Sequence, residues 1–440
     1  MHPLKSSGPD GFHAYFYQHN WQIVGEDIVK FIQTPFLIAR IPNDLTQIKL
    51  VLIPKVPNPE SVTQLRSISL CNILYKLLTK LLVNKLKPFL LAMIHPAQSR
   101  FVLGRRATDN YILAQELLHF IHHQRRKTNL MASKIDLEKA YDKLEWSFIQ
   151  YTLTFYHFPT PIIELIMACI LSSSISILWN GKVSAPFWPS HGIRQGDPLS
   201  PFLFILCLNH LSLSLDQALH TKRLSLIRVG RRPIGFNHIL FADDIFLFAK
   251  ANIQECTTLF NLFSSFCEVS GQICSATKSK LFFSWNTPSE TQHDISSFTN
   301  MPIVQDLGKY LGMPLLTKRK STPAFQPLLD KIHSHIRACQ GILLARQMLL
   351  TQVILESDSL SVVDAISSNS PHGDLQPIVQ GILLLSSSFD FWKVKHLKRD
   401  YNKVAHELAK LARETRMSQT WTNMEPSMVH QLCQIDRAKC

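Results

Sequence analysis

Two adjacent aspartates, Asp243 and Asp244, stand between two apolar segments, and this arrangement constrains the fold more than any other feature. The run from His238 to Ala249 predicts a hairpin, because apolar strand-forming residues flank residues that favour turns. Aspartates in turns often only bond to their own backbone. Here the flanking strands are apolar on both faces and are expected to be buried, where neighbouring carboxylates repel each other unless cations are bound. The hairpin is therefore a candidate cation site.

A third aspartate, Asp136, is expected at the end of another strand. Met131 to Ile135 predicts this strand, and Leu137 to Tyr151 predicts a helix directly after it. Nucleotidyl transfer requires charge to be neutralised on the attacking, leaving and equatorial oxygens, which two metal ions about 3.5–4 Å apart can do together. Mg²⁺ prefers hard oxygen ligands, which Asp136, Asp243 and Asp244 would supply. Spacing alone does not establish such a site.

The composition indicates a folded chain and favours a negatively charged partner. With 440 residues and 46% hydrophobic content, the chain is long enough for two or three packed domains. The formal net charge of +14 and the pI near 9.4 favour nucleic acid as partner, although basic proteins without such a partner also exist. Nine cysteines without C-x-x-C spacing or paired histidines fit a reducing compartment and suggest neither a zinc site nor disulfides. Residues 1–10 do not resemble a secretory signal, so export is not expected.

Other segments predict a mixed α/β architecture. Ile48 to Pro54 predicts a short strand, and Leu70 to Leu91 predicts a helix with one buried face. Ile162 to Trp179 is apolar enough to raise the question of a membrane span, but it carries Glu164 and four serines, so we expect a buried helix followed by a strand. At about Leu316 a basic, helix-prone stretch begins, which marks a change of character along the chain.

Three motifs occur in the order Lys134-Ile-Asp-Leu-Glu-Lys-Ala-Tyr-Asp142, Gly192-Ile-Arg-Gln-Gly-Asp-Pro-Leu-Ser-Pro201 and Phe241-Ala-Asp-Asp244. Together and in this order they resemble motifs of the non-LTR, LINE-type retrotransposon reverse transcriptases, especially those of plants. Further segments extend the resemblance over residues 6–316; among them are Leu52-Ile-Pro-Lys55, Gln98-Ser-Arg-Phe-Val-Leu-Gly-Arg105 and Tyr310-Leu-Gly-Met-Pro-Leu315. The resemblance implies an α/β (α+β) fold with the palm and fingers of a right-hand polymerase, an antiparallel palm sheet and a truncated RNase H-like α/β segment after it.

The resemblance also implies roles for residues around these motifs. Asp136, Asp243 and Asp244 would be the catalytic, metal-binding acids for two Mg²⁺ ions, which Mn²⁺ could replace, with Asp244 the least certain direct ligand. Tyr141 falls where the family places an aromatic steric gate against a ribose 2′-hydroxyl. Core packing is the alternative role of this tyrosine.

Nucleotide binding is implied for five further residues. Gln195 and Gly196 would contact the incoming nucleotide and the template strand. Lys55 and Arg66 would bind the triphosphate, because a point charge and a planar fork both suit phosphate. Lys278 would donate a proton to the departing pyrophosphate. Solvated surface charge is the alternative for these three basic residues.

The C-terminal part resembles the second half of a plant RNase H-like domain over residues 353–415. Glu356-Ser-Asp358 and the run from Arg399 to Lys410 carry this resemblance, and Asp358 would be a remnant of its acid set. The expected elements are a strand and a helix over Val353–Ile366, a strand over Phe391–Lys398 and a helix over Lys403–Thr415. The acid set is incomplete, so no independent nuclease activity is expected. The basic clusters Arg125–Lys127 and Lys318–Lys320 would contact a phosphate backbone or lie in solvated loops.

The expected organisation is fingers and the N-terminal part of the reverse transcriptase domain in 1–130, palm in 131–316, thumb remnant or linker in 317–352, partial RNase H-like domain in 353–415 and tail in 416–440. The expected function is RNA-directed DNA polymerase, using dNTPs, an RNA template and a DNA primer. The alternatives are a decayed relic that only binds nucleic acid, and an RNA–DNA hybrid ribonuclease, which the incomplete acid set disfavours. We expect an intracellular location, nuclear or cytoplasmic, without a membrane; the sequence leaves the oligomeric state open.

Overall fold

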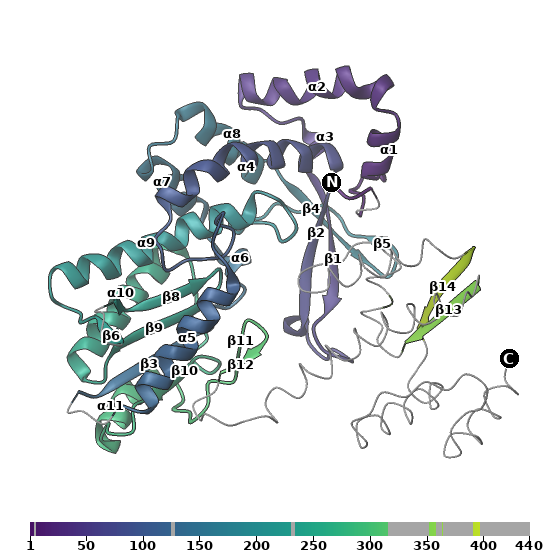
Figure 1. Ribbon diagram of the computed structural model, residues 1–440. Helices are drawn as coiled ribbons and strands as arrows, with labels where there is room; N and C mark the ends of the chain where they lie inside the picture. The colour runs from purple at the N-terminus through teal and green to yellow at the C-terminus, as the bar shows by residue number, and fades with distance from the viewer. Residues whose placement is uncertain are drawn as a thin grey trace, which may run out of the picture. The chain divides into compact units, whose positions relative to one another are not determined.

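The computed structural model describes residues 1–3, 6–124, 128–229, 234–315, 352–357, 363 and 390–396. The chain divides into two compact units, Met1–Ser321 and Thr322–Cys440. Nearly all described helices and strands belong to the first unit (Figure 1). In the second unit, β13 (Gln352–Ser357) and β14 (Phe391–His396) pair in parallel, so the structure confirms the strands expected at these two places.

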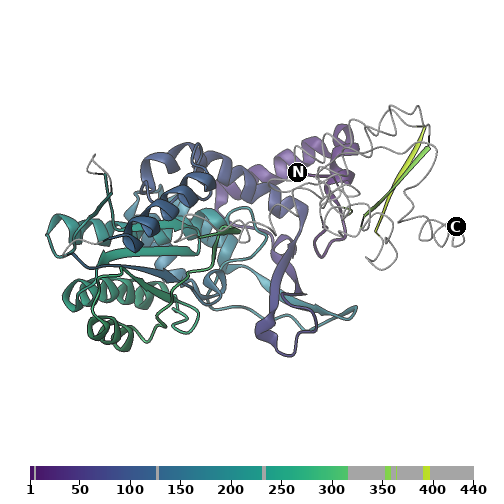
Figure 2. The same cartoon turned by 60° about the horizontal axis from the view of Figure 1, so that its bottom comes forward.

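A four-stranded antiparallel sheet, here called the central sheet, forms the middle of the first unit in the order β10-β3-β9-β8. Its strands are β3 (Leu130–Ile135), β8 (His238–Phe241), β9 (Asp244–Lys250) and β10 (Lys280–Phe283). Side chains alternate between its faces. Met131 and Leu247 belong to the core that includes α9 (Ser200–His220) and α10 (Ile253–Ser270). Their neighbours Ala132 and Phe248 belong to the core beneath α5 (Ala107–His122), and Figure 2 shows α5 and α10 on opposite sides of the sheet.

A second sheet has the order β2-β1-β4-β5 and is mixed, because β1 and β4 run in parallel. Its strands are β1 (Gln47–Pro54), β2 (Leu65–Cys71), β4 (Ser174–Trp179) and β5 (Lys182–Val183). β1 confirms the strand expected over residues 48–54. β1 and β2 form a long antiparallel hairpin, in which the short 3₁₀ helix Val62–Gln64 precedes β2. This hairpin extends away from the central sheet (Figure 1).

Helices and two small hairpins complete the first unit. The helices not yet given are α1 (Ala14–His19), α2 (Trp21–Ile38), α3 (Asn43–Thr46), α4 (Ile73–Met93), α6 (Ala140–Lys143), α7 (Trp146–Phe155), α8 (Thr160–Leu171) and α11 (Ser289–Thr299). The hairpins pair β6 (Ile227–Val229) with β7 (Ile234–Phe236), and β11 (Lys309–Tyr310) with β12 (Met313–Pro314). The structure confirms the expected helix and strand within residues 162–179, as α8 and β4.

The helix expected over residues 137–151 is wrong as a continuous element. The chain after Asp136 stays extended, because Leu137 pairs with Cys274 and the backbone N–H of Glu138 donates to Ile273 O at 2.8 Å. α6 then ends at Lys143, and a second helix, α7, starts at Trp146. Contacts with a distant segment thus override a local helical pattern.

The other two differences from expectation are smaller. α4 begins at Ile73 and not at residue 70, because Cys71 still pairs with Ile48 in the β-hairpin. The β8–β9 turn consists of Ala242 and Asp243, while Asp244 already pairs with Phe241 as the first residue of β9.

Helix α9 is, among the described helices, the one whose length and composition would suit a membrane span. It covers Ser200–His220, and 67% of its apolar stretch of 18 residues is buried inside the protein. Its residues contribute to the core on one face of the central sheet. Burial of this kind is also typical of core helices.

Candidate active site

The three predicted acids lie at one end of the central sheet. Asp136 directly follows β3, Asp243 lies in the β8–β9 turn, and Asp244 opens β9. Ile135 pairs with Ile245 on the neighbouring antiparallel strand. Asp136, which follows Ile135, and Asp244, which precedes Ile245, therefore lie at the same end of the strand pair. All three acids line one cavity of about 470 Å³, here called the acidic cavity.

The loop of residues 275–279 holds the backbone of Asp136 in place through hydrogen bonds. The backbone N–H of Asp136 donates to Ser279 Oγ at 3.0 Å, and its carbonyl accepts from Ser275 N at 2.9 Å. The Ser279 N–H in turn donates to Ser275 O at 2.8 Å, which closes the loop on itself. Thr277 and Lys278, at the tip of this loop, line the acidic cavity.

Gln98 holds the acidic turn from the other side, and sequence analysis assigned it no role. Ala242 in the turn has a φ of +54°, a conformation that L-residues adopt at a cost. Its N–H donates to Gln98 Oε1 at 3.0 Å, and the N–H of Arg100 donates to the same oxygen at 2.9 Å. Gln98 and Ala242 are 144 residues apart, so no local pattern could reveal this contact.

Electrostatic conflict inside the acidic cavity centres on Asp244. Burial raises the pKa of this carboxyl, and the negative charges of Asp243 and Asp136 raise it further, while Lys134 and Arg100 act in the opposite direction. Among the described residues, no three acidic, histidine or cysteine side chains lie close enough together to hold a metal ion as they stand. The donor set nevertheless suits a divalent cation, because three carboxylates line one partly buried cavity and a cation would relieve their repulsion.

Three lysines also line the acidic cavity, of which sequence analysis had singled out only Lys278. The other two are Lys134 and Lys280. Lys134 Nζ donates to Lys309 O at 2.5 Å, and burial lowers the pKa of this amine. Side chains alternate along a strand, so Lys134 faces the same side as Asp136, two residues further on. This spacing is the sequence signal that could have identified Lys134 as a cavity residue.

Tyr141 lies close to the acids but packs as a core residue does. Its ring stacks on Phe204 with the centroids 5.0 Å apart and the planes at 12°. Burial and the charge of Asp243 raise the pKa of Tyr141 to about 12. The Tyr141 carbonyl accepts from Ile193 N at 2.8 Å, which joins this segment to the second motif. The tyrosine ring is half-buried, so both expected roles are compatible with its position.

Gln195 and Gly196 connect the second motif to the second sheet. The N–H of Ser69 on β2 donates to Gln195 O at 2.9 Å. Gly196 has a φ of +111°, and a Cβ at this position would lie 3.0 Å from Ser69 O. The close approach of the two backbones explains why glycine stands here. These residues do not line the acidic cavity.

A buried charged network stands next to this loop and was missed by sequence analysis. Asp197 Oδ2 accepts from Tyr75 Oη at 2.9 Å and lies 3.8 Å from Arg194 Nη1. The Arg194 guanidinium also lies 4.9 Å from the Tyr75 ring centroid and donates to Cys169 O at 2.5 Å. The network links α4 and α8 to the segment that leads into α9, so these buried contacts hold the loop of the second motif in place.

The remaining predicted residues lie away from the acidic cavity or outside the described residues. Lys55 follows β1 and donates to Thr63 O at 3.2 Å, and Arg66 is exposed on β2. The charge of Lys55 acts on the Asp142 carboxyl, whose pKa burial raises. Several predicted features lie outside the described residues: Asp358, the basic clusters Arg125–Lys127 and Lys318–Lys320, the run Arg399–Lys410 and the helix over Lys403–Thr415.

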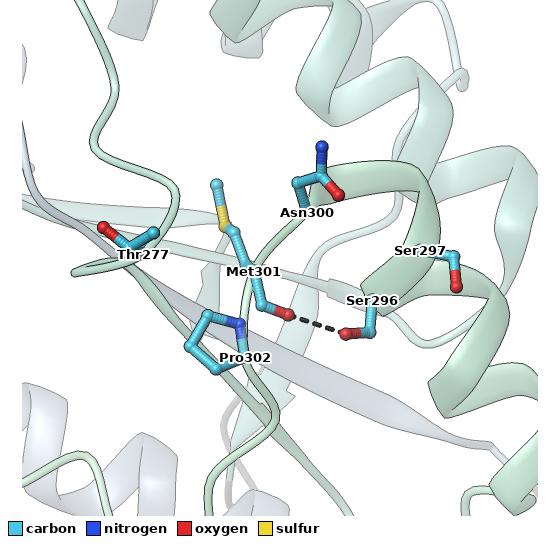
Figure 3. A pocket seen from close by; sticks show the side chains of 6 residues that line it. All are labelled: Thr277, Ser296, Ser297, Asn300, Met301 and Pro302. Atoms are coloured by element: carbon cyan, nitrogen blue, oxygen red, sulfur yellow. Dashed lines mark hydrogen bonds between the residues drawn. The ribbon is translucent and has the colours of Figure 1, made fainter.

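A second cavity, of about 490 Å³, adjoins the acidic one and shares Thr277 with it. Its wall consists of polar side chains around Met301, namely Thr277 on one side and Ser296, Ser297 and Asn300 of the α11 end on the other (Figure 3). Ser296 Oγ donates to Met301 O at 2.7 Å, which holds the wall together.

An antiparallel sheet that carries acids at the strand ends, next to a second sheet on a long hairpin, is the palm-and-fingers arrangement of template-directed polymerases. Residues 53–315 match the family described as reverse transcriptase (RNA-dependent DNA polymerase), and the chain belongs to this family. Residues 320–412 match a second family, described as reverse transcriptase-like. These matches confirm the predicted reverse transcriptase followed by an RNase H-like segment.

Three curated relatives show where the similarity lies. A 149 kDa protein of transposon TX1 from Xenopus laevis is 29% identical over 266 residues, which cover 59% of this chain and 20% of the relative. The Pol polyprotein of the type-2 retrotransposable element R2DM from Drosophila melanogaster is 26% identical over 249 residues, which cover 57% and 22%. An uncharacterised mitochondrial protein of Arabidopsis thaliana is 51% identical over 65 residues, 15% of this chain and 53% of the relative. The matched part of this chain thus spans about a fifth of the two transposon proteins.

Among solved structures, apo telomerase from Candida tropicalis, truncated from its C-terminal domain, is similar with a TM-score of 0.40 and 13% identity. The similarity covers 65% of this chain and 59% of the telomerase chain.

Proposed function

We propose that this chain copies an RNA template into DNA, with Asp136, Asp243 and Asp244 as its catalytic, metal-binding acids. The observation that carries the proposal is the convergence of these acids on one cavity, at the end of the central sheet of a reverse transcriptase family member. The three carboxylates supply the hard oxygens that Mg²⁺ prefers, and Mn²⁺ would substitute. Bound divalent ions would neutralise charge that develops on the phosphate oxygens during transfer.

The side chains around the acidic cavity would then position the substrates. The primer 3′-hydroxyl would lose its proton to water and attack the α-phosphate of a dNTP. A new O–P bond forms, the bond from the α-phosphorus to the oxygen shared with the β-phosphate breaks, and pyrophosphate leaves. Lys278, which lines the acidic cavity, would give a proton to the departing pyrophosphate. Tyr141 would crowd a ribose 2′-hydroxyl beside the acids.

The fingers would bind the rest of the nucleotide and the template. Lys55 and Arg66 on the β1–β2 hairpin would bind the triphosphate. Gln195 and Gly196, held against β2 by the bond from Ser69 N, would contact the nucleotide and the template strand.

Primer extension on poly(rA)/oligo(dT) with Mg²⁺ tests this function. The purified chain should extend the primer, and Asp243→Asn should lose extension by several orders of magnitude while it retains binding of the primer–template. Asp294→Asn, an exposed carboxylate on α11, is the matched control and should extend normally. If the parent chain binds the primer–template in a salt-sensitive way but does not extend it, the chain is a relic that only binds nucleic acid.

We also propose that the chain acts inside the cell, in the nucleus, with an RNA template, a DNA primer and dNTPs as partners and without a membrane. The formal charge of +14 supports a nucleic-acid partner. A fluorescent fusion that stays in the cytoplasm would overturn the nuclear location. For the RNase H-like segment we propose no activity of its own, and metal-dependent cleavage of the RNA strand of a hybrid by the Asp243→Asn chain would contradict this.

A further inference from the structure

The two-residue turn between β8 and β9, here called the acidic turn, has a backbone conformation that its residues do not favour. Ala242, the first of the two, has a φ of +54° and is 2% exposed, and Asp243 is the second. Hairpin turns with a positive φ at the first residue prefer glycine there, because a Cβ crowds the backbone in the left-handed region. An alanine therefore keeps this conformation only where surrounding groups hold it.

One side-chain oxygen holds the acidic turn. Gln98 Oε1 accepts from the N–H of Ala242 at 3.0 Å and from the N–H of Arg100 at 2.9 Å. Gln98 is 1% exposed, and its Nε2 has no hydrogen-bond partner among the described residues. A buried N–H group without an acceptor costs stability. The benefit of glutamine at this position thus lies in the oxygen that faces the acidic turn.

The backbone of Gln98 is itself fixed to the edge of the central sheet. β8 is an edge strand of this sheet, and Gln98 forms a parallel bridge with Leu240 on it. The N–H of Leu240 donates to Ala97 O at 2.9 Å, and the N–H of Ser99 donates to Leu240 O at 3.2 Å. The guanidinium of Arg105 donates to Gln98 O. Gln98 therefore reaches the acidic turn from a backbone that cannot shift without breaking several hydrogen bonds.

The conformation of Ala242 determines where Asp243 lies. Phe241 and Asp244 pair with each other as the ends of β8 and β9, so a change of φ at Ala242 has to be absorbed within the acidic turn and would displace Asp243. Asp243 lines the acidic cavity together with Asp136. Functional sites hold their groups to within about 0.5 Å of the productive geometry. A group that fixes Ala242 therefore also fixes a metal ligand of the proposed function.

We propose that Gln98 is a positioning residue for metal binding: its side-chain oxygen holds Ala242 in the left-handed conformation and thereby keeps Asp243 where it binds a divalent cation. The proposal rests on the proposed function, in which Asp243 is a metal ligand. Gln98 does not line the acidic cavity, so it acts through the turn and not by contact with the ion. Glycine at position 242 should replace the action of Gln98, because glycine adopts a positive φ without steric cost.

Titration of the full chain with Mn²⁺, followed by electron paramagnetic resonance of the free ion, tests the proposal without turnover. Gln98→Met keeps the length of the side chain but removes the oxygen. It should weaken Mn²⁺ binding about tenfold, the factor that corresponds to the cost of the left-handed conformation for an L-residue. The double variant Gln98→Met/Ala242→Gly should bind Mn²⁺ almost as tightly as the parent chain. Asp243→Asn should lose the binding, which assigns the signal to the acidic cavity.

Two matched controls separate positioning from general stability. Gln150→Met changes an exposed glutamine on α7 and should bind Mn²⁺ like the parent chain. Ala39 also has a positive φ, of +50°, but it directly follows α2 and does not line the acidic cavity. Gln98→Met/Ala39→Gly should therefore bind Mn²⁺ as weakly as Gln98→Met. Rescue by both glycine substitutions, or by neither, would overturn the proposal.

A direct contact of Gln98 with a substrate would give a different result. In that case Gln98→Met would bind Mn²⁺ normally but show a raised KM for dTTP or weaker binding of the primer–template, and the positioning role would be wrong. If Gln98→Met does not fold, the double variant with Ala242→Gly decides the question. Restored folding with Mn²⁺ binding near that of the parent chain supports the proposal, and any other result overturns it.

Primer extension distinguishes failure of this proposal from failure of the proposed function. A parent chain that binds Mn²⁺ through Asp243 in a way that depends on Gln98, but extends no primer, refutes the polymerase and supports the positioning role. A parent chain that extends primers, while Gln98→Met binds Mn²⁺ normally, refutes the positioning role alone. A parent chain that binds no Mn²⁺ also contradicts the positioning role.

Discussion

At the scale of single residues, the acidic cavity brings together carboxylates that repel one another and that would bind metal ions in the proposed function. Asp244 is the carboxyl on which burial and the charges of Asp243 and Asp136 act together to raise the pKa. Carboxyl groups whose pKa is shifted by burial and by neighbouring charges cluster at functional sites. The turn conformation at Ala242, with its positive φ, is a second local cost at the same place.

Asp244→Asn tests whether a bound cation relieves the repulsion among the three carboxylates. In metal-free buffer at pH 7 the variant should be more stable than the parent chain, because one of three repelling charges is gone. Mg²⁺ at tenfold its Kd should stabilise the parent chain by about 1.4 kcal/mol and the variant by less. Urea unfolding with and without Mg²⁺ measures both effects, and Asp294→Asn on α11 is the control. Equal stabilisation of all three chains by Mg²⁺ would show that the acids hold no metal.

At the scale of elements, the second motif joins the palm to the fingers. The segment from Gly192 to Gly196 hydrogen bonds to the β3–α7 connection on one side and to β2 on the other. Its shape is set from beneath by Asp197, which is 6% exposed and links Tyr75 to Arg194. The position of the proposed nucleotide-binding loop therefore depends on a buried charged network and not on the loop residues alone.

Asp197→Ala should destabilise the chain by about 3–5 kcal/mol, because it leaves the buried Arg194 guanidinium without its carboxylate. Lys250→Ala breaks a pair with Glu255 in which the lysine side chain is 43% exposed, and it should cost at most about 1 kcal/mol. Urea unfolding of the two variants compares a buried with a partly exposed ion pair. Similar losses for both would mean that the Asp197 network is not the support that we describe.

At the scale of the whole molecule, the first unit packs two cores on opposite faces of the central sheet. His238, the first residue of β8, is buried where α9 packs on this sheet. Its ring nitrogens lie 2.6 Å from Asn237 Oδ1 and 2.9 Å from Ser212 Oγ. Burial, and to a lesser degree the charge of His95, lowers the pKa of His238 to about 3. The histidine is thus neutral in the folded chain at ordinary pH.

Stability should therefore decrease as the pH falls below about 6.5, the ordinary pKa of histidine in an unfolded chain. Between this value and about 3 the unfolded state binds the additional proton, so the free energy of unfolding falls with falling pH. From pH 7.5 to 5.0 the contribution of His238 should be about 2 kcal/mol. His238→Asn should remove that part of the slope, whereas His293→Gln, an exposed histidine, should not. A variant with the full slope of the parent chain would refute the assignment to His238.

Several features followed from residues that are close together in the sequence. The hairpin around Asp243 and Asp244, the strand before Asp136 and the apolar run of α8 each carry their own pattern, because burial of a strand or helix demands a local periodicity. The motifs that contain the acids identified the family for the same reason, since each is a contiguous run of residues. The grouping of these acids in one cavity agrees with this expectation, while their roles stay a prediction.

Only the tertiary structure decided the rest, because it depends on contacts between residues far apart in the chain. The extended segment after Asp136 follows from the pairing of Leu137 with Cys274, and the clamp on the acidic turn comes from Gln98. Lys134 and Lys280 gather because β3 and β10 happen to be neighbours in the central sheet. The sequence by itself determined which residues are chemically able to act; the order of strands in the sheet determined which of them meet.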